Sequence, residues 1–202
     1  MANGRAVDVR LGDGTPCADE IGEVARTLGI DVVAREGGGA HTVVGDVALP
    51  GEAPGWMVEA AVLRALEPEN VLFLCVANSA RSQMAEGLAR SMAPGGVTIS
   101  SAGSEPTRVR PQAIAALSEV GVDISGHASN GTDDVEGQVD AVITLCAEEV
   151  CPVWLKQATR LHWGLPDPAG AGHTPEEEMD AFRSVRDELT RRLTVLFLGV
   201  SE

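Results

Sequence analysis

The fold is decided by the stretch VLFLCVANSARSQMAEG, residues 71–87. Residues 71–76 form a short apolar run of the kind that becomes a buried strand. Residues 82–92, SQMAEGLARSM, are amphipathic with the spacing of a helix. A buried strand, a tight polar loop and a helix in this order predict one βα unit of an α/β protein.

The same alternation continues along the chain. Apolar runs at 71–76, 97–103, 139–146 and 158–163 predict strands, and stretches at 82–92, 111–121, 148–156 and 175–193 predict helices. Buried strands joined by helices are typical of parallel sheets. We therefore expect an α/β domain over residues 69–202, with a four-stranded parallel sheet in a doubly wound arrangement. The apolar tail 194–200 predicts the packed end of the last helix, or a dimer contact.

Residues 1–68 predict a separate, small amino-terminal α/β unit. The pattern indicates strands at 7–11 and 31–34, helices at 19–28 and 55–66, and a hairpin over 42–44 and 46–49. A unit of about 65 residues is near the lower limit for a self-sufficient core. Its role is open between docking, dimerisation and redox chemistry; Cys17, between a strand and a helix, motivates the redox alternative. Residues 67–69 are the expected hinge.

The composition excludes several classes of function. The chain of 202 residues has 15 Lys and Arg against 30 Asp and Glu, a net charge of −15. Such a polyanion is a poor partner for nucleic acid or an anionic membrane, because both are bound through clustered cations. The sequence predicts neither a membrane-spanning run nor a signal peptide. We expect a cytoplasmic protein, in which four cysteines indicate catalysis or metal binding rather than structural disulfides.

The loop after the first strand of the larger domain carries the chemistry. Cys75 and Arg81 are spaced so that backbone N–H groups and the positive end of the helix converge near the thiol. This arrangement predicts a cradle for a tetrahedral oxyanion, formed by Val76, Ala77, Asn78, Ser79, Ala80 and Arg81. The guanidinium can bind two oxyanion oxygens, and the same field favours the nucleophilic thiolate of Cys75. Ser82 can donate to the sulfur, and Asn78 tolerates a left-handed backbone.

A second motif supplies a proton donor. Asp167 lies between two prolines in GLPDPAG, residues 164–170. Prolines stiffen a loop and fix the direction of the carboxyl group, as general acid catalysis requires. We predict that Asp167 protonates the leaving oxygen; the alternative is a turn without a catalytic role.

Two further cysteines follow the third strand. Cys146 ends the apolar run 139–146, and Cys151 follows five residues later. Because the carboxyl ends of parallel strands meet at one edge of the sheet, Cys75 and Cys146 should open onto the same crevice. That placement allows a thiol relay. The alternative is a metal site with His162, although a single Cys-x4-Cys pair is a poor zinc signature.

Together, these motifs resemble the thioredoxin-coupled arsenate reductases, which share the fold of low-molecular-weight protein tyrosine phosphatases. The resemblance covers residues 70–193 and rests on VLFLCVANSARSQMAEG, SSAG, GVDISGHAS, DAVITLC with a following cysteine, HWGLPDPAG and FRSVRDEL. The phosphatase branch generally lacks the two later cysteines and carries aromatics near its cleft, whereas this chain has no tyrosine. The alternatives are a phosphomonoester hydrolase using Cys75, Arg81 and Asp167, and a non-catalytic oxyanion sensor, which would need neither nucleophile nor acid.

The resemblance implies arsenic detoxification by a cysteine relay without a tightly bound cofactor. Cys75 would attack arsenate, and Asp167 would protonate the leaving hydroxide. Cys146 would attack Cys75 and release arsenite, and Cys151 would then attack Cys146. Thioredoxin or a similar thiol donor would reduce the resulting disulfide. The x4 spacing of the last two cysteines is shorter than is common in the family, which leaves another reductant open.

The resemblance also implies a potassium site in some members. Asn78, Glu86 and Ser101 match three of the ligand positions, but Asn130 stands where the family has an aspartate. Loss of a carboxylate weakens a site for a hard cation. At most a weak potassium site is therefore expected.

Overall fold

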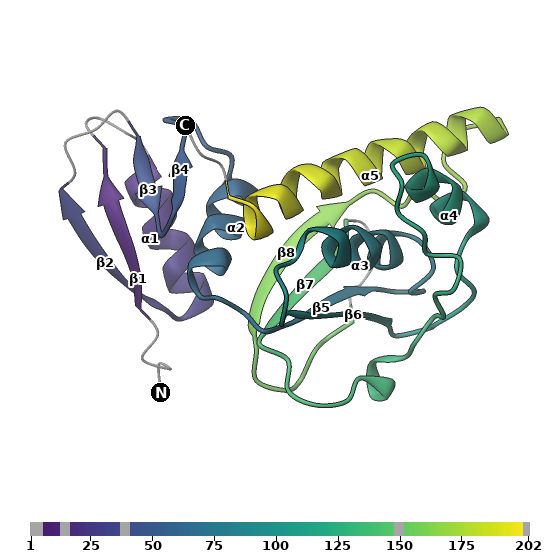
Figure 1. Cartoon of the computed structure of the whole chain (residues 1–202), viewed down its shortest axis with the longest axis horizontal. Helices are drawn as coiled ribbons and strands as arrows, with labels where there is room; N and C mark the ends of the chain where they lie inside the picture. The colour runs from purple at the N-terminus through teal and green to yellow at the C-terminus, as the bar shows by residue number, and fades with distance from the viewer. Residues whose placement is uncertain (1–5, 13–16, 37–40, 148–151, 200–202) are drawn as a thin grey trace. The chain divides into compact units, whose positions relative to one another are not determined.

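The structure is a computed structural model that describes residues 6–12, 17–36, 41–147 and 152–199. The chain divides into two compact units (Figure 1). The first comprises residues 1–68 together with 192–202, and the second comprises residues 69–191.

The second unit is built on a four-stranded parallel sheet with the strand order β6-β5-β7-β8. The strands are β5 (Asn70–Cys75), β6 (Thr98–Gly103), β7 (Ala141–Cys146) and β8 (Thr159–Leu165). Cys75 pairs with Gly103 in register, and Leu74 pairs with Thr144. The predicted parallel sheet is confirmed, and its carboxyl edge gathers the ends of β5 and β7.

Helices flank this sheet (Figure 1). They are α3 (Arg81–Met92), α4 (Pro111–Ser118) and α5 (Pro175–Phe197). The short η1 (Thr132–Asp134) is a 3-10 turn. Helix α3 packs against β5, β6 and α4. Pro111 opens α4 at a position where its missing N–H costs no helical hydrogen bond.

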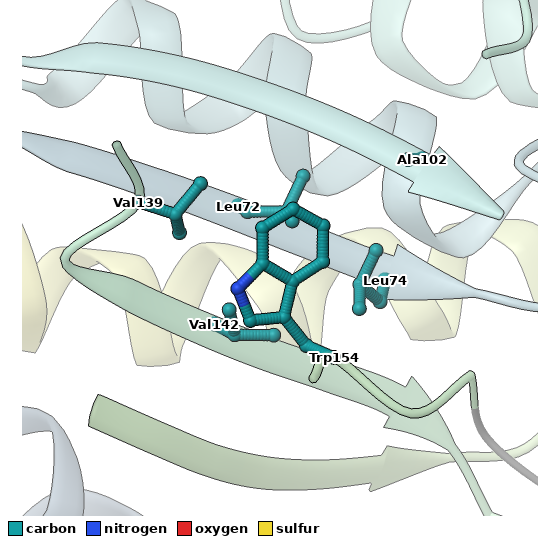
Figure 2. Close-up of a cluster of buried hydrophobic side chains, with 6 residues drawn as sticks. All are labelled: Leu72, Leu74, Ala102, Val139, Val142 and Trp154. Carbon is teal, nitrogen blue, oxygen red and sulfur yellow. The ribbon is translucent and has the colours of Figure 1, made fainter. Parts of the chain in front are cut away.

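The helix expected at 148–156 is wrong in the part that the structure describes. Residues 148–151 lie outside the described residues, and residues 152–155 have no helical structure. Trp154 is buried among Leu72, Leu74, Ala102, Val139 and Val142 (Figure 2). Its neighbours Val153 and Leu155 are 74% and 89% exposed. Burial that alternates with a period of two residues is typical of an extended chain. Because exposed and buried positions are both apolar here, the sequence does not show this alternation.

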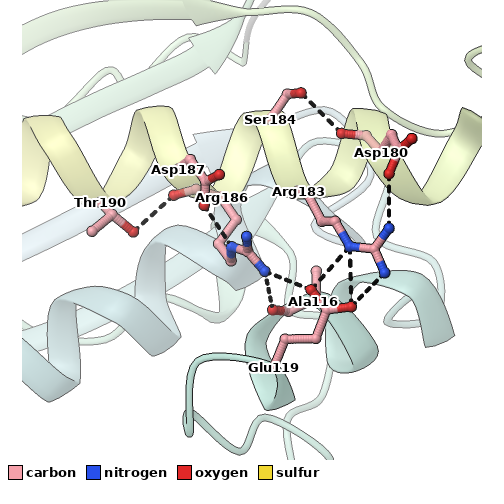
Figure 3. Close-up of polar contacts among 8 residues, drawn as sticks. All are labelled: Ala116, Glu119, Asp180, Arg183, Ser184, Arg186, Asp187 and Thr190. Atoms are coloured by element: carbon pink, nitrogen blue, oxygen red, sulfur yellow. Dashed lines mark hydrogen bonds and ion pairs between the residues drawn. The ribbon is translucent and has the colours of Figure 1, made fainter.

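Helix α5 is longer than predicted and ends in the first unit. It continues to Phe197, and Val195, Leu196 and Phe197 are buried, as the interpretation of the tail as a packed helix end predicts. Within the second unit, α4 and α5 are joined by Glu119, which binds Arg183 and Arg186 (Figure 3). Hydrogen bonds from Arg183, and then from Arg186, lower the pKa of Glu119 to about 2.

The first unit is the small α/β unit that the sequence predicts. Its sheet has the order β2-β1-β3-β4, with β1 parallel to β2 and antiparallel to β3. The elements are β1 (Ala6–Leu11), α1 (Cys17–Leu28), β2 (Asp31–Glu36), β3 (Thr42–Val44), β4 (Val47–Leu49) and α2 (Gly55–Ala65). Arg64 on α2 holds the hairpin turn through two hydrogen bonds to Asp46, at 2.7 and 2.6 Å. In the part of the chain that the structure describes, no helix is both long enough and apolar enough to cross a membrane.

Candidate active site

The loop between β5 and α3 begins at Cys75, which is buried at the end of β5. Its backbone passes close to Gly103 on the neighbouring strand. A Cβ atom at Gly103 would meet the carbonyl oxygen of Val76 at 2.3 Å and the amide nitrogen of Asn78 at 2.8 Å. Real Cβ atoms do not approach backbone so closely, so glycine is required there. Asn78 has a φ of 44°, a left-handed conformation that asparagine tolerates.

The carbonyl groups of the loop are turned toward the segment after β6. The carbonyls of Val76, Ala77 and Ser79 accept hydrogen bonds from the amides of Glu105, Thr107 and Arg110. In a trans peptide the next N–H points opposite to the carbonyl, so the amides of residues 77, 78 and 80 lie on the other side of the loop. Helix α3 begins after Ala80 without a side-chain cap. Amides of this kind at a helix start bind anions well.

The side chain of Asn78 organises the loop from within. Its Oδ1 accepts hydrogen bonds from the Asn130 amide at 2.8 Å and from Gln83 Nε2 at 2.9 Å. Since a backbone amide can only donate, the orientation of the Asn78 side chain is fixed. Its Nδ2 therefore donates to Ser82 Oγ and Ser101 Oγ, both at 2.8 Å. All four side-chain hydrogen bonds of a fully buried asparagine are made.

Ser82 connects this network to the thiol. Its Oγ lies 3.0 Å from Cys75 Sγ. Because Ser82 Oγ already accepts from Asn78 Nδ2, its hydroxyl hydrogen is available to the sulfur. A hydrogen bond donated to sulfur stabilises the thiolate more than the thiol.

Arg81 lies in the loop with its side chain only 4% exposed. Its Nη1 donates to the carbonyl oxygen of Leu165 at 3.0 Å, at the end of β8. Its Nη2 lies 3.3 Å from Asp167 Oδ2, a contact longer than a tight ion pair. The guanidinium is thus held at the carboxyl edge of the sheet, between the loop and the segment of Asp167.

Asp167 is partly exposed, at 45%, in a braced loop. Its Oδ1 accepts from the amide of Ala169 at 3.1 Å. Glu178 on α5 accepts from the amide of Gly170 at 2.8 Å and from Gln112 Nε2 at 3.1 Å. These contacts fix the backbone beside Asp167, while its carboxylate stays open to solvent.

The two later cysteines are only partly described. Cys146 is buried at the end of β7, next to β5 in the sheet, and both Cys75 and Cys146 carry thiols rather than a disulfide. Cys151 lies outside the described residues. His162, the alternative metal ligand, has its Nδ1 2.8 Å from Thr144 Oγ1. Within the described residues, no group of three or more His, Cys, Asp or Glu side chains is placed so that it could hold a metal ion.

The sequence that builds this site matches a known family. A sequence profile of the low molecular weight phosphotyrosine protein phosphatases covers residues 70–202. The chain belongs to this family. Residues 1–68 precede the part of the chain that the family profile matches.

Within the low molecular weight phosphatase family, the expected likeness to arsenate reductases is confirmed. The arsenate reductase of Halalkalibacterium halodurans is 43% identical over 126 residues, 61% of this chain and 91% of the relative. The arsenate reductase of Bacillus subtilis is 43% identical over 131 residues, 63% of this chain and 94% of the relative. A crystal structure of arsenate reductase from Archaeoglobus fulgidus gives a TM-score of 0.55 at 31% identity, covering 62% of this chain and 97% of that chain.

The sequence analysis did not predict three sets of contacts around the site. Gln83 bridges Asn78 and His127, with 2.9 Å between Gln83 Oε1 and His127 Nδ1. The Leu165 carbonyl holds Arg81, and Arg90 forms an ion pair with Glu86. Only the last had a local signal, because Glu86 and Arg90 are four residues apart on a helix.

Proposed function

We propose that this protein reduces arsenate to arsenite, with Cys75 as nucleophile and Cys146 and Cys151 as resolving thiols. The observation that carries the proposal is the placement of the Cys75 thiol. It lies within hydrogen-bond distance of Ser82 in a loop whose Arg81 faces Asp167, at the end of a strand adjacent to the one that ends in Cys146. Two relatives named arsenate reductase match this chain over most of their own length.

In the first step, the amides of residues 76–81 and the guanidinium of Arg81 hold the arsenate oxygens. The thiolate of Cys75 forms an S–As bond as an As–O bond breaks. Asp167 donates a proton to the departing oxygen, which leaves as water or hydroxide. The product is a thiol adduct in which arsenic is still pentavalent.

Reduction takes place in the second step. The thiolate of Cys146 attacks the Cys75 sulfur, and the electron pair of the S–As bond stays on arsenic. Arsenic gains two electrons and leaves as arsenite, while two thiols become a Cys75–Cys146 disulfide. Cys151 then attacks the Cys146 sulfur, which restores the Cys75 thiol and leaves a Cys146–Cys151 disulfide.

An external dithiol closes the cycle. We assign this role to thioredoxin or a similar thiol donor, because a protein disulfide needs two electrons from another thiol pair. The proposed setting is the cytoplasm, where thiols stay reduced, and the proposed biological role is arsenic detoxification. No tightly bound cofactor takes part in these steps.

A second function is favoured by one observation. The family that the chain matches is described as a phosphotyrosine protein phosphatase. Cys75, Arg81 and Asp167 would serve phosphomonoester hydrolysis equally well, with water attacking a phosphocysteine. The two cysteines after β7 have no part in that reaction.

The test is arsenite production from arsenate with thioredoxin, thioredoxin reductase and NADPH. Cys75→Ser, Cys146→Ser and Cys151→Ser should each abolish turnover, and Cys151→Ser should accumulate a Cys75–Cys146 disulfide in mass spectra. A wild type that is silent with arsenate but hydrolyses an aryl phosphate in a Cys75-dependent way would establish the phosphatase instead.

We further propose that residues 69–202 form the catalytic domain and residues 1–68 an accessory domain. Its role stays open between docking, redox chemistry through Cys17, and homodimer formation through this unit or the apolar tail. Normal turnover by Cys17→Ser would exclude the redox role, and a monomer in sedimentation would exclude the dimer.

A further inference from the structure

A buried carboxylate lies within the network that supports the loop. Glu86 on α3 is 6% exposed. Its Oε2 accepts from Ser101 Oγ at 2.5 Å, and its Oε1 lies 2.5 Å from Arg90 Nη2. Arg90 is itself tied to β6, because its Nε and Nη2 donate to the carbonyl oxygen of Ile99 at 3.4 and 3.2 Å. A carboxylate removed from water needs a nearby positive charge, and Arg90 supplies one.

Glu86 is connected to the nucleophile by an unbroken series of hydrogen bonds. Ser101 donates to Glu86, and therefore accepts from Asn78 Nδ2. The same Nδ2 group donates to Ser82 Oγ, which lies 3.0 Å from Cys75 Sγ. Cys75, Asn78, Ser82 and Ser101 are all buried. A change at Glu86 is therefore transmitted to the sulfur through contacts that water does not replace.

The residues expected to bind potassium do not fit that ion here. Both oxygens of Glu86 are engaged, one by a guanidinium that would repel a cation. Asn78 Oδ1 already accepts two hydrogen bonds, one of them from the amide of Asn130. Asn130 brings no charge in place of the missing carboxylate. Some of the oxygen atoms that a potassium ion would need are present. Those of Asn78 and Glu86 already accept hydrogen bonds from protein groups, and Arg90 already balances the charge of Glu86.

We propose that Arg90 is a positioning residue whose guanidinium supplies, within the chain, the positive charge that Glu86 needs to hold the hydrogen bonds leading to Cys75. The loop then needs no monovalent metal ion. This inference deepens the proposed function and rests on it for its biological meaning. Its physical content concerns the reactivity of Cys75 and can be measured without arsenic.

The experiment measures the rate at which iodoacetamide alkylates Cys75 at pH 7, followed by mass spectrometry of the peptide that carries Cys75. Wild type should react at equal rates in sodium and potassium chloride. Arg90→Gln should react about tenfold more slowly, because it leaves a buried carboxylate unpaired and disturbs Ser82. Arg90→Lys keeps the charge and should recover most of the rate.

The double variant Glu86→Gln with Arg90→Gln separates charge compensation from simple packing. It removes the unpaired charge and should react faster than Arg90→Gln alone. The matched control is Arg191→Gln, which breaks a surface ion pair of 2.8 Å with Glu188 on α5 and should leave the rate unchanged.

Two results would overturn the inference. One is an Arg90→Gln rate equal to that of Arg191→Gln. The other is a wild-type rate several-fold higher in potassium than in sodium, since a metal ion would then balance Glu86. Arsenite production is measured on the same preparations. A wild type without that activity but with the expected alkylation rates removes the proposed function and leaves the role of Arg90 standing.

Discussion

Two arginine–carboxylate pairs support the Cys75 loop, and their exposures are reversed. In one, the cation is inside: the side chain of Arg81 is 4% exposed and that of Asp167 is 45% exposed. In the other, the anion is inside: the side chain of Glu86 is 8% exposed and that of Arg90 is 53% exposed. The separations also differ, at 3.3 Å for the first pair and 2.5 Å for the second.

We interpret the difference between the pairs as a difference in task. Under the proposed function, the longer pair would let Arg81 bind an oxyanion and Asp167 take up a proton from solvent. In the shorter pair, both oxygens of Glu86 already have partners, and we assign the pair a structural role in support of the loop. Separating the two pairs by substitution therefore tests whether one is catalytic and the other supportive.

The largest expected effect follows from Arg81→Lys. Lysine keeps the charge but loses the planar fork that binds two oxygens and the Leu165 carbonyl together. We expect kcat/KM for arsenate to fall by about 10²–10³-fold. Arg183→Lys, a matched change on the surface of α5, should leave kcat/KM unchanged. A loss from Arg81→Lys no greater than that control would remove Arg81 from substrate binding.

Asp167→Asn should have the next largest effect. The substitution keeps the shape but removes the proton donor, so kcat should fall about 10²-fold. Phosphate affinity, measured by calorimetry, should be kept or improved, because Arg81 no longer faces a competing carboxylate. Asp180→Asn, which alters an exposed carboxylate paired with Arg183 at 2.7 Å, is the control. Equal losses in kcat and in phosphate affinity would contradict the assignment of Asp167 as an acid.

The sequence predicted the structural features of the site that depend on residues close together in the chain. The strand, loop and helix around Cys75 follow from apolar runs and from the Cys-x5-Arg spacing, and the Asp167 turn follows from its two prolines. The roles of these residues remain predictions. The hydrogen bonds of Asn78 to Ser101 and Asn130 join residues 23 and 52 positions apart, and no local pattern specifies them.

One error came from the spacing of apolar residues along the chain. Residues 152–155 contain enough apolar positions to suggest a helix, yet alternate between buried Trp154 and exposed neighbours. Pro152 supplies no amide to a helix, which was the available warning. The apolar tail, in contrast, forms the packed end of helix α5 as predicted, because the buried side of the helix continues through Phe197.

The smallest expected effect concerns a third set of pairs, in which Glu119 and Arg183 are exposed to solvent and Arg186 is buried. Glu119→Gln removes the carboxylate that binds Arg183 and Arg186 (Figure 3) and should lower stability slightly without changing activity. The pKa of Glu119 lies at about 2 in the folded state and is lowered by Arg183 and then Arg186. Its contribution is therefore complete above the unfolded value near 4.5 and declines as the pH falls toward 2.

Urea midpoints of wild type and Glu119→Gln, measured between pH 3 and pH 7, check this sign. The gap between the two proteins should be constant at the upper end and narrow below about pH 4.5. Glu136→Gln, an exposed carboxylate that makes none of the ion pairs found among the described residues, is the control for loss of charge. A gap that widens in acid would contradict the assignment.

The burial of Trp154 also provides an intrinsic fluorescence signal for the segment around it. The chain has three tryptophans and no tyrosine, so its near-ultraviolet emission comes from few sources. Trp154 lies three residues after Cys151 and is packed on the sheet (Figure 2), with an indole N–H that has no hydrogen-bond partner among the described residues. Indole emission shifts to longer wavelength when the ring meets water. A change of chain path near Cys151 that lifts this ring can therefore be followed by stopped-flow fluorescence, without an attached dye.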